Sequence, residues 1–420
     1  MKIKLYLLLI IPSLFFNLLS AQEKTKSDST NNYKDAIKLY IDCNYCDIDH
    51  FKKEIKLVNY VRDRKEADVH LIITSMRTGS GGKEYNLRFI GKRKYQHLND
   101  TISFSLPPKS TSEEIRNAQI TAIKRGLTPF ILKTSLGEKI KISFAKDDEK
   151  KQEKIEDKWH SWVFEARISG YTNGEEVYTH LSTWGNISAT KITPDIKIEL
   201  NYNNSFNKSS YKFFNKEITS ITKTNRAAAL ISKSIGEHWA FGGLSSIYSS
   251  TYSNIAGASS ISPAFEYNVF KYSNATSKQL RFLYQIGYKY NKYIDSTIFD
   301  KITESYFYNM LTIKFKSVQE WGAIEGSVFG STFLNDFSKN NIGAYMGGNV
   351  RLFKGLSFNL YGGYSQQRDQ ITLAKKASST EDILLRKKEM ASNYNFWMNF
   401  GLSYTFGSIY NNIVNPRFDN

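Results

Sequence analysis

The feature that most constrains this chain is a strict alternation of apolar and polar side chains, which recurs from about residue 159 to 406 in segments of about ten residues. In the last segment Phe396 and Phe400 share one face, whereas Asn395 and Asn399 share the other. Successive side chains of a strand point to opposite sides, so such a strand has two different surroundings. Because aromatic side chains concentrate on the apolar face and at the segment ends, the pattern indicates lipid on one side and a polar lumen on the other.

About twelve such segments can be counted, and single-chain bacterial barrels use an even number. They begin near Trp162, Tyr178, Ile196, Ser220, Trp239, Ala256, Leu280, Tyr306, Trp321, Ile342, Leu356 and Tyr394. Short turns follow the even-numbered segments, and the longest connections, 203–219, 292–304 and 366–392, follow odd-numbered ones. The turn at 273–278 is the one even-numbered connection that is longer than this pattern predicts. We therefore predict a mainly β chain: a transmembrane antiparallel β-barrel of about 12 strands at 159–406, preceded by a small periplasmic α/β domain. A soluble antiparallel sandwich, which also alternates, is the alternative.

The N-terminus has the form of a secretory signal. A basic start, Met1 to Lys4, precedes an apolar run from Leu5 to Leu19, and Ser20-Ala21-Gln22 follows as a cleavage site. The run is shorter than the roughly 20 residues of a spanning helix and contains Pro12. We expect residues 1–21 to be removed, and Gln22 to begin an exported chain.

Residues 22–145 carry mixed helix and strand signals, which predict the α/β domain. Strands are expected at 36–43, 67–75, 85–90 and 101–106, and a short helix at 47–56. Thr111 and Glu114 have capping-box spacing for a second helix, expected to end at Gly126 because Pro129 follows. Residues 146–158 are highly charged and are expected to be a linker.

Cys43 and Cys46 form a C-x-x-C pair, and the sequence has two cysteines in all. A local disulfide is expected in an oxidising compartment, with a catalytic dithiol or a metal site as the alternatives. The glycine-rich segment 78–83 could in principle cradle a phosphate through its backbone amides. A strand rather than a helix is expected behind it, so a hairpin turn is the preferred interpretation.

The final strand resembles the β-signal by which outer-membrane barrels reach their insertion machinery. Its polar, glycine and two aromatic positions are Asn399, Gly401, Tyr404 and Phe406. The resemblance implies the barrel-insertion machinery as a partner. The chain continues past the last aromatic as a tail, 407–420, expected to be periplasmic.

Lys and Arg number 57 against 40 Asp and Glu, a formal net charge of +17. For an exported chain such an excess favours anionic outer-membrane lipid and lipopolysaccharide as partners over nucleic acid. The loop 366–392, which carries several of these cations, is expected outside the cell.

Charged residues on the polar face of the strands are the candidate lumen lining: Glu165, Arg167, Lys197, Glu199, Glu266, Arg281, Lys289, Lys314, Glu325 and Arg351. They favour a narrow pore or transporter for small solutes, although pairing of opposite charges would block the interior. The rival hypothesis is a non-conducting anchor whose periplasmic domain binds a periplasmic protein or envelope polymer. The barrel segments hold His160, His180 and His238 without a catalytic motif, so we expect no enzyme, no metal and no cofactor.

Taken together, the chain resembles Bacteroidota-type outer-membrane β-barrel proteins with an N-terminal periplasmic α/β domain. The resemblance lies in Val58 to Arg64, Ala67 to His70, Thr78 to Gly82 and Phe89 to Gly91, and it resumes from Tyr404 to Phe418. It implies a cell outer-membrane location and this architecture. It assigns no activity and carries over no functional residue.

Overall fold

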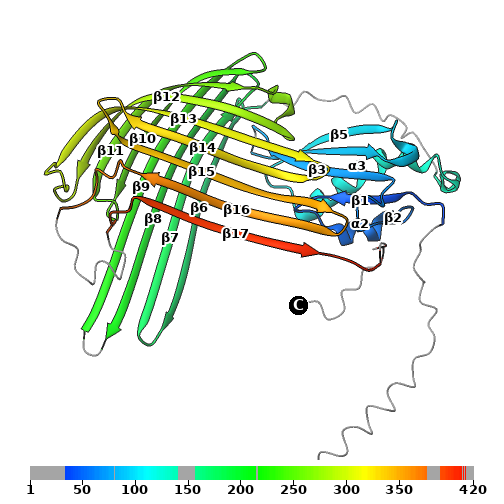
Figure 1. Ribbon diagram of the computed structural model, residues 1–420, viewed down its shortest axis with the longest axis horizontal. Helices are drawn as coiled ribbons and strands as arrows, with labels where there is room; N and C mark the ends of the chain where they lie inside the picture. The colour runs from blue at the N-terminus through cyan, green and yellow to red at the C-terminus, as the bar shows by residue number, and fades with distance from the viewer. Residues whose placement is uncertain are drawn as a thin grey trace, which may run out of the picture.

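A computed structural model describes residues 34–79, 81–140, 157–213, 216–375, 388–408, 410 and 412. The described chain forms a five-stranded sheet with helices and a separate twelve-stranded sheet (Figure 1). The expected signal 1–21, most of the linker 146–158 and most of the tail 407–420 lie outside the described residues. No helix in the described part is long and apolar enough to cross a membrane.

The first part is an α/β domain with the strand order β2-β1-β3-β4-β5. β1 runs parallel to β2 and β3, and the other pairs are antiparallel. Its strands are β1 Lys38–Asp42, β2 Asn59–Tyr60, β3 Val69–Arg77, β4 Lys83–Gly91 and β5 Asn99–Leu106. Its helices are α2 Ile48–Glu54 and α3 Ser112–Ile131, with single 3₁₀ turns η1 Arg93–Tyr95 and η2 Ser135–Lys139. The expected strands and helices are all present, and β2 is an addition.

Helix α3 begins as predicted but ends later. The Thr111 hydroxyl accepts a hydrogen bond from the Glu114 amide at 3.2 Å, and the Thr111 amide donates to the Glu114 carboxylate at 2.7 Å. The expected end at Gly126 is wrong, because the helix continues through Pro129 to Ile131. Proline removes one backbone donor, but this last turn places Leu127 and Phe130 in the core, which offsets that loss.

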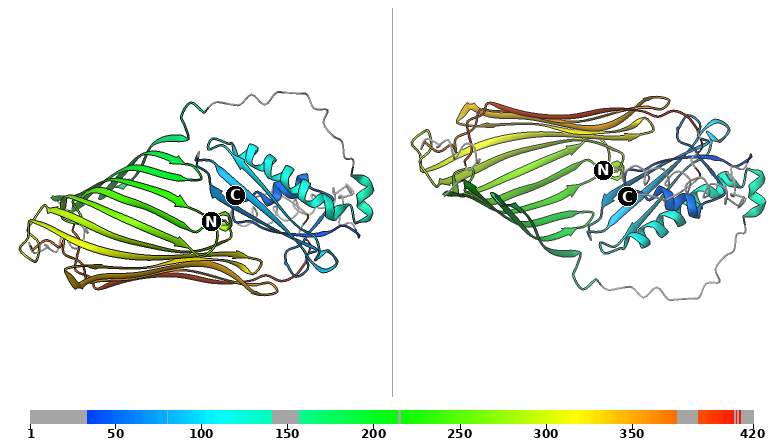
Figure 2. Two further views of the ribbon diagram at one scale, coloured as in Figure 1. Left: turned by 90° about the horizontal axis from the view of Figure 1, so that it is seen from above. Right: turned by 90° about the horizontal axis from the view of Figure 1, so that it is seen from below.

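The second part, which we call the barrel sheet, holds twelve antiparallel strands paired in chain order from β6 to β17. The strands are β6 Trp162–Glu175, β7 Tyr178–Ile192, β8 Ile196–Phe213, β9 Lys216–Ile235, β10 Trp239–Ser250, β11 Ile255–Asn268, β12 Lys278–Tyr293, β13 Thr303–Gln319, β14 Gly322–Phe333, β15 Asp336–Phe353, β16 Leu356–Gln367 and β17 Tyr394–Tyr404, with η3 Tyr272–Asn274 between β11 and β12. The predicted fold class is confirmed as a mainly β chain in which a twelve-stranded antiparallel sheet follows a small α/β domain. The sheet curves strongly (Figure 2), and among the described residues no pairing joins its edge strands β6 and β17.

Two strand boundaries differ from the sequence-based prediction. The connection expected at 203–219 is mostly strand, because β8 and β9 stay paired as far as Phe213 and Lys216. Polar Asn, Ser and Lys residues fill this stretch, so it lacks the apolar row on which the prediction depended. β15 begins at Asp336 rather than near Ile342. The long connections after β12 and β16, and the longer turn after β11, lie where they were expected.

The exposure of alternate residues identifies the two faces of the barrel sheet. Along β12, Tyr284 is 41% exposed and Ile286 44%, whereas Gln285 between them is 9% exposed. The apolar row therefore faces outward and the polar row inward, in agreement with the predicted alternation.

The α/β domain lies at the end of the barrel sheet that carries the β13–β14 and β15–β16 turns (Figures 1 and 2). We call this the turn end and the opposite one the loop end. Val69 and Leu71 of β3 belong to the core under the helices. The alternate residue His70 lies near Asp42, which binds the barrel sheet. The five-stranded sheet thus has one face toward the helices and the other toward the barrel sheet.

Gly126 shows how closely α3 approaches this sheet. A Cβ at this position would lie 2.2 Å from the ring of Phe89, which is fully buried. We predict that Gly126→Ala destabilises the α/β domain by about 1–3 kcal/mol, because either the ring or the helix must move. Pulse proteolysis in increasing urea measures this, with the exposed Lys124→Ala as the control. Equal stability of the two variants would contradict the close packing.

Candidate functional site: the junction of the two parts

Arg351 joins the barrel sheet to the α/β domain. It lies near the end of β15 and donates two hydrogen bonds to Asp42 at the end of β1, Nη1 to Oδ2 at 2.7 Å and Nη2 to Oδ1 at 2.9 Å. Its guanidinium also lies over the ring of Tyr40, 5.3 Å from the ring centre. Two parallel charged hydrogen bonds fix orientation as well as distance, so this pair sets how the domain sits on the sheet.

His70 lies behind this pair in the α/β domain. Its side chain is fully buried, its Nε2 is 3.6 Å from Asp42 Oδ2, and its ring meets the edge of Tyr40 at 5.0 Å. Neither ring nitrogen has a hydrogen-bond partner among the described residues. A second ionisable group thus faces the carboxylate that binds Arg351.

The surroundings lower the pKa of both Asp42 and His70. Burial alone would raise the pKa of Asp42, but the neighbouring His70, together with the two hydrogen bonds and the charge of Arg351, outweighs it and lowers the pKa. Burial lowers the pKa of His70, and the Asp42 carboxylate opposes this only in part. At neutral pH the junction therefore holds an ionised Asp42, a charged Arg351 and a neutral His70.

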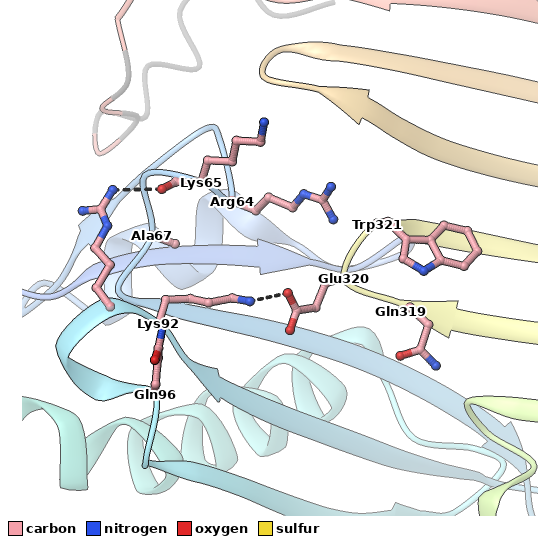
Figure 3. A pocket seen from close by; sticks show the side chains of 9 residues that line it. Arg64, Lys65, Ala67, Lys92, Gln96, Gln319, Glu320 and Trp321 are labelled. Carbon is pink, nitrogen blue, oxygen red and sulfur yellow. Dashed lines mark hydrogen bonds and ion pairs between the residues drawn. The ribbon is translucent and has the colours of Figure 1, made fainter.

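Further ion pairs surround this contact at the turn end. Lys92 pairs with Glu320 of the β13–β14 turn (Figure 3), and Lys354 of the β15–β16 turn pairs with Glu66. The backbone amide of Gly355 donates to Asp63 at 2.9 Å. Two consecutive turns of the barrel sheet are therefore held by charged groups of the α/β domain.

The end of the chain takes part as well. Arg62 donates to the carbonyl oxygens of Phe406 and Gly407, both at 3.1 Å. Val61 forms an isolated antiparallel bridge with Tyr410. The segment after β17 is thus attached to the α/β domain.

The glycine-rich hairpin between β3 and β4 also touches the barrel sheet. The Thr78 amide donates to Gly82 at 3.0 Å, and Gly81 has a φ of +79°, as a tight turn requires. A Cβ on Gly79 would lie 2.3 Å from the carbonyl oxygen of Ile192 at the end of β7. Glycine therefore permits close backbone contact between the two parts.

The junction is polar. The core of the α/β domain consists of residues between Ala36 and Ile140 and contains no described side chain of the barrel sheet. Two pockets flank the loop of Arg64 and Lys65, one of about 630 Å³ against the β13–β14 turn (Figure 3) and one of about 300 Å³ against the β15–β16 turn. Such an interface resembles transient interfaces rather than a shared core.

Most of the candidate lumen charges are paired in the structure. Glu165 pairs with Arg167, Lys197 with Glu199 at 2.9 Å, and Glu266 with Arg281 at 3.6 Å. Arg351 binds Asp42 of the α/β domain instead, and Glu165 also lies 3.6 Å from Arg77 of that domain. Lys289 is attracted by the charge of Asp369 and repelled by that of Arg226. Lys314 and Glu325 have no ion pair within the described residues.

At the loop end, residues after β16 fold back onto the inner face. Ile371 is buried against Tyr306 and Phe333, and Ile298 donates a backbone hydrogen bond to Leu373 at 2.9 Å. Asn254 donates to the carbonyl oxygens of Asp295 and Thr372, both at 2.9 Å. Loops from three connections therefore meet at this end.

The remaining sequence-based candidates are distributed as follows. Cys43 and Cys46 are bonded to each other, with their Cα atoms 5.8 Å apart. The β-signal positions Asn399, Gly401 and Tyr404 lie on the edge strand β17, and Phe406 lies just after it.

His180 is the barrel histidine with the most polar contacts. Its ring nitrogens lie 2.9 Å from Ser209 Oγ and 2.8 Å from Ser182 Oγ, but Ser182 is only 3% exposed. No cluster of His, Cys, Asp and Glu suited to a metal occurs in the described part of the chain. The absence of enzyme activity stays a prediction.

Sequence reasoning did not single out Asp42 or Arg226 as candidate residues. Asp42 ends a predicted strand and carried no motif. Ile221 and Ile231 of β9 are outward-facing, at 48% and 56% exposed, and the outward row follows from them in steps of two. Arg226 lies between the positions of that row, so the same counting could have placed it on the inner face.

The fold and the junction define the class: an antiparallel β-barrel protein with an N-terminal α/β domain. No protein-family model and no curated protein matches the chain. Several solved structures match it, among them the following three. The translocator domain of autotransporter NalP from Neisseria meningitidis has 13% identity, 58% coverage of this chain and 80% of that chain, and a TM-score of 0.20. The NanC porin has 8% identity, 58% and 100% coverage and a TM-score of 0.24. CdiB from Acinetobacter baumannii has 10% identity, 80% and 71% coverage and a TM-score of 0.27.

These scores are too low to carry an argument about function, so the class rests on the strand pairing of the chain itself. The resemblance to Bacteroidota-type proteins stays a prediction.

The lowered pKa of His70 gives a pH dependence with a definite sign. Below its ordinary pKa of about 6.5 the unfolded chain binds a proton that the folded domain does not, so stability falls as pH falls. Asp42 acts in the same direction at lower pH. We predict that the α/β domain is less stable at pH 5.0 than at pH 7.5. The loss is ~1.4 kcal/mol for each pH unit over which the unfolded chain holds a proton on His70 that the folded domain lacks. Pulse proteolysis at both pH values measures this. His70→Gln should flatten the dependence and His50→Gln should keep it, and a slope that persists in His70→Gln would rule out this origin.

Proposed function

We propose that the protein is an outer-membrane β-barrel protein that acts as a narrow pore or transporter for small solutes, with the α/β domain as a gate at its periplasmic end. In this proposal the loop end faces the outside, where the basic loop 366–392 lies against lipopolysaccharide. The turn end and the α/β domain face the periplasm.

The observation that carries the proposal is the polar junction. Arg351, Lys354 and Glu320 hold the α/β domain through ion pairs, while its hydrophobic core is complete without the barrel sheet. A domain attached in this way can leave the rim without exposing its core. This is the property that a gate needs.

A second candidate is a non-conducting anchor. It is favoured by the pairing of the interior charges Glu266 with Arg281 and Lys197 with Glu199, and by the loops that fold back at the loop end. In that case the pockets beside Arg64 and Lys65 would serve to bind a periplasmic protein or an envelope polymer.

Conductance in a planar bilayer tests the gate. We predict that the wild type conducts rarely, and that Arg351→Glu raises the open fraction about tenfold, since replacing attraction with repulsion at Asp42 is worth ~1.4 kcal/mol or more. The double variant Arg351→Glu/Asp42→Arg should restore the closed state. Lys278→Glu, an exposed cation near the same end with no described ion pair, is the control.

Three results separate the candidates. Conduction that rises in Arg351→Glu and falls again in the double variant supports the gate. Free conduction by the wild type contradicts it. No conduction by any variant, with the barrel shown to be folded by its faster migration on unboiled gels, favours the anchor.

Orientation is tested on intact cells. We predict that a cysteine at Asn335, in the exposed β14–β15 connection, reacts with an impermeant maleimide, whereas one at Asp195 in the β7–β8 turn does not. The reverse result would invert the proposed topology, and recovery of the protein in the soluble periplasm would refute the outer-membrane location.

A further inference from the structure

We propose that the inner wall of strands β6 to β10 holds a binding site for a sugar acid, that is, a mono- or disaccharide that carries a carboxylate. The inference deepens the proposed function, because it names the class of solute that a pore or transporter would take. The binding itself does not require conduction.

The site is a single row of side chains across five strands. The strand register places Arg167 opposite Asn186, Asn186 opposite Asn203, Asn203 opposite Arg226, and Arg226 opposite Tyr248. Neighbouring strands are about 4.8 Å apart, so the two arginines lie at either side of two amides, each within reach of a ligand placed over them.

This row faces the interior. Ile168, Ile187 and Ile247 directly adjoin Arg167, Asn186 and Tyr248 in the chain and are 86%, 60% and 64% exposed. Because neighbouring residues of a strand point to opposite faces, the arginine and asparagine side chains point inward. Here they line a pocket of about 450 Å³, which is within the range of small-molecule sites.

The arginines give the site a net positive charge. Arg226 has no carboxylate partner among the described residues, in contrast to the interior cations Arg281 and Arg351. Arg167 pairs with Glu165, and Arg77 shares that carboxylate at 3.6 Å. A guanidinium presents paired donors that match a carboxylate, so Arg226 is positioned to bind the acid group.

The two asparagines are fixed and keep free polar atoms. Asn186 Nδ2 donates to Asn203 Oδ1 at 2.8 Å. Asn186 Oδ1 and Asn203 Nδ2 have no further partner among the described residues, which leaves one acceptor and one donor side by side. This pair suits the hydroxyl groups of a sugar.

Aromatic rings distinguish a sugar from a simple anion. Trp184 lies in the next row of the same wall, opposite Ser169 and Ser205, and is 42% exposed although it points inward. It lines the pocket together with Tyr248. An inorganic anion would need only the arginines, whereas an open indole and a phenol provide apolar faces for the C–H side of a pyranose ring.

Isothermal titration calorimetry of the full chain, folded in detergent micelles, tests the site with three probes. D-galacturonate carries both the ring and the carboxylate, D-galactose only the ring, and acetate only the carboxylate. We expect galacturonate to bind about tenfold or more tightly than either of the others, because only it engages the arginines and the rings together.

Two variants assign the contacts. Arg226→Gln should weaken galacturonate about tenfold and leave galactose unchanged, and Trp184→Ala should weaken both sugars. Lys314→Gln is the matched control, since Lys314 is also an inner-row cation without a described ion pair but lies outside this pocket. It should bind galacturonate as the wild type does.

Equal affinity for galacturonate and galactose, an unaffected Arg226→Gln variant, or no binding by the folded protein would each overturn the proposal. These outcomes are independent of the gate. Binding without conduction would refute the pore but keep the site. Conduction without binding would refute the site but keep the pore.

Discussion

The arrangement of this molecule depends on one charge pair, Arg351 with Asp42. Both side chains are largely withdrawn from water, at 23% and 16% exposed, so losing either partner leaves a poorly solvated charge. Because the pair is bidentate, it fixes an angle as well as a distance. In this orientation Lys92 reaches Glu320 on the β13–β14 turn, and Glu66 reaches Lys354 on the β15–β16 turn. His70, buried behind Asp42, is kept neutral by its burial, whereas Asp42 stays ionised because its charged partner Arg351 helps to outweigh burial.

Local rules predicted most of the fold. A row such as Tyr284, Ile286 and Tyr288 can be satisfied only by a strand with one apolar face, and the predicted starts of most strands match the structure closely. The misses have physical reasons. Helix α3 passes Pro129 because burial of Phe130 outweighs a lost backbone donor, and burial is a property of the tertiary structure. The β8–β9 hairpin extends through a polar stretch, because strand pairing needs only backbone groups and gives no alternation to detect.

The functional residues were less predictable, because their partners are remote. Period two placed Arg351 on the inner row, but no local rule could pair it with Asp42, which is 309 positions away. Likewise, the arginines of the proposed sugar-acid site come from β6 and β9. Their common row appears only when the register of three hairpins is known, since a shift by one residue would turn every side chain to the other face. Predicting this site therefore needs exact pairing, whereas predicting the barrel needs only periodicity.

The junction also links the α/β domain to an open edge of the barrel sheet. Residues after β17 bind the loop after β2 through Arg62 with Phe406 and Gly407, and through the bridge of Val61 with Tyr410. The same loop leads to Asp63 and Glu66, which hold the β15–β16 turn. Movement of the domain would therefore pull on β17, one of the two strands that must meet to close the barrel. The position of the α/β domain and that of the edge strand are thus mechanically coupled, so a domain that leaves the turn end would also release β17 to move relative to β6.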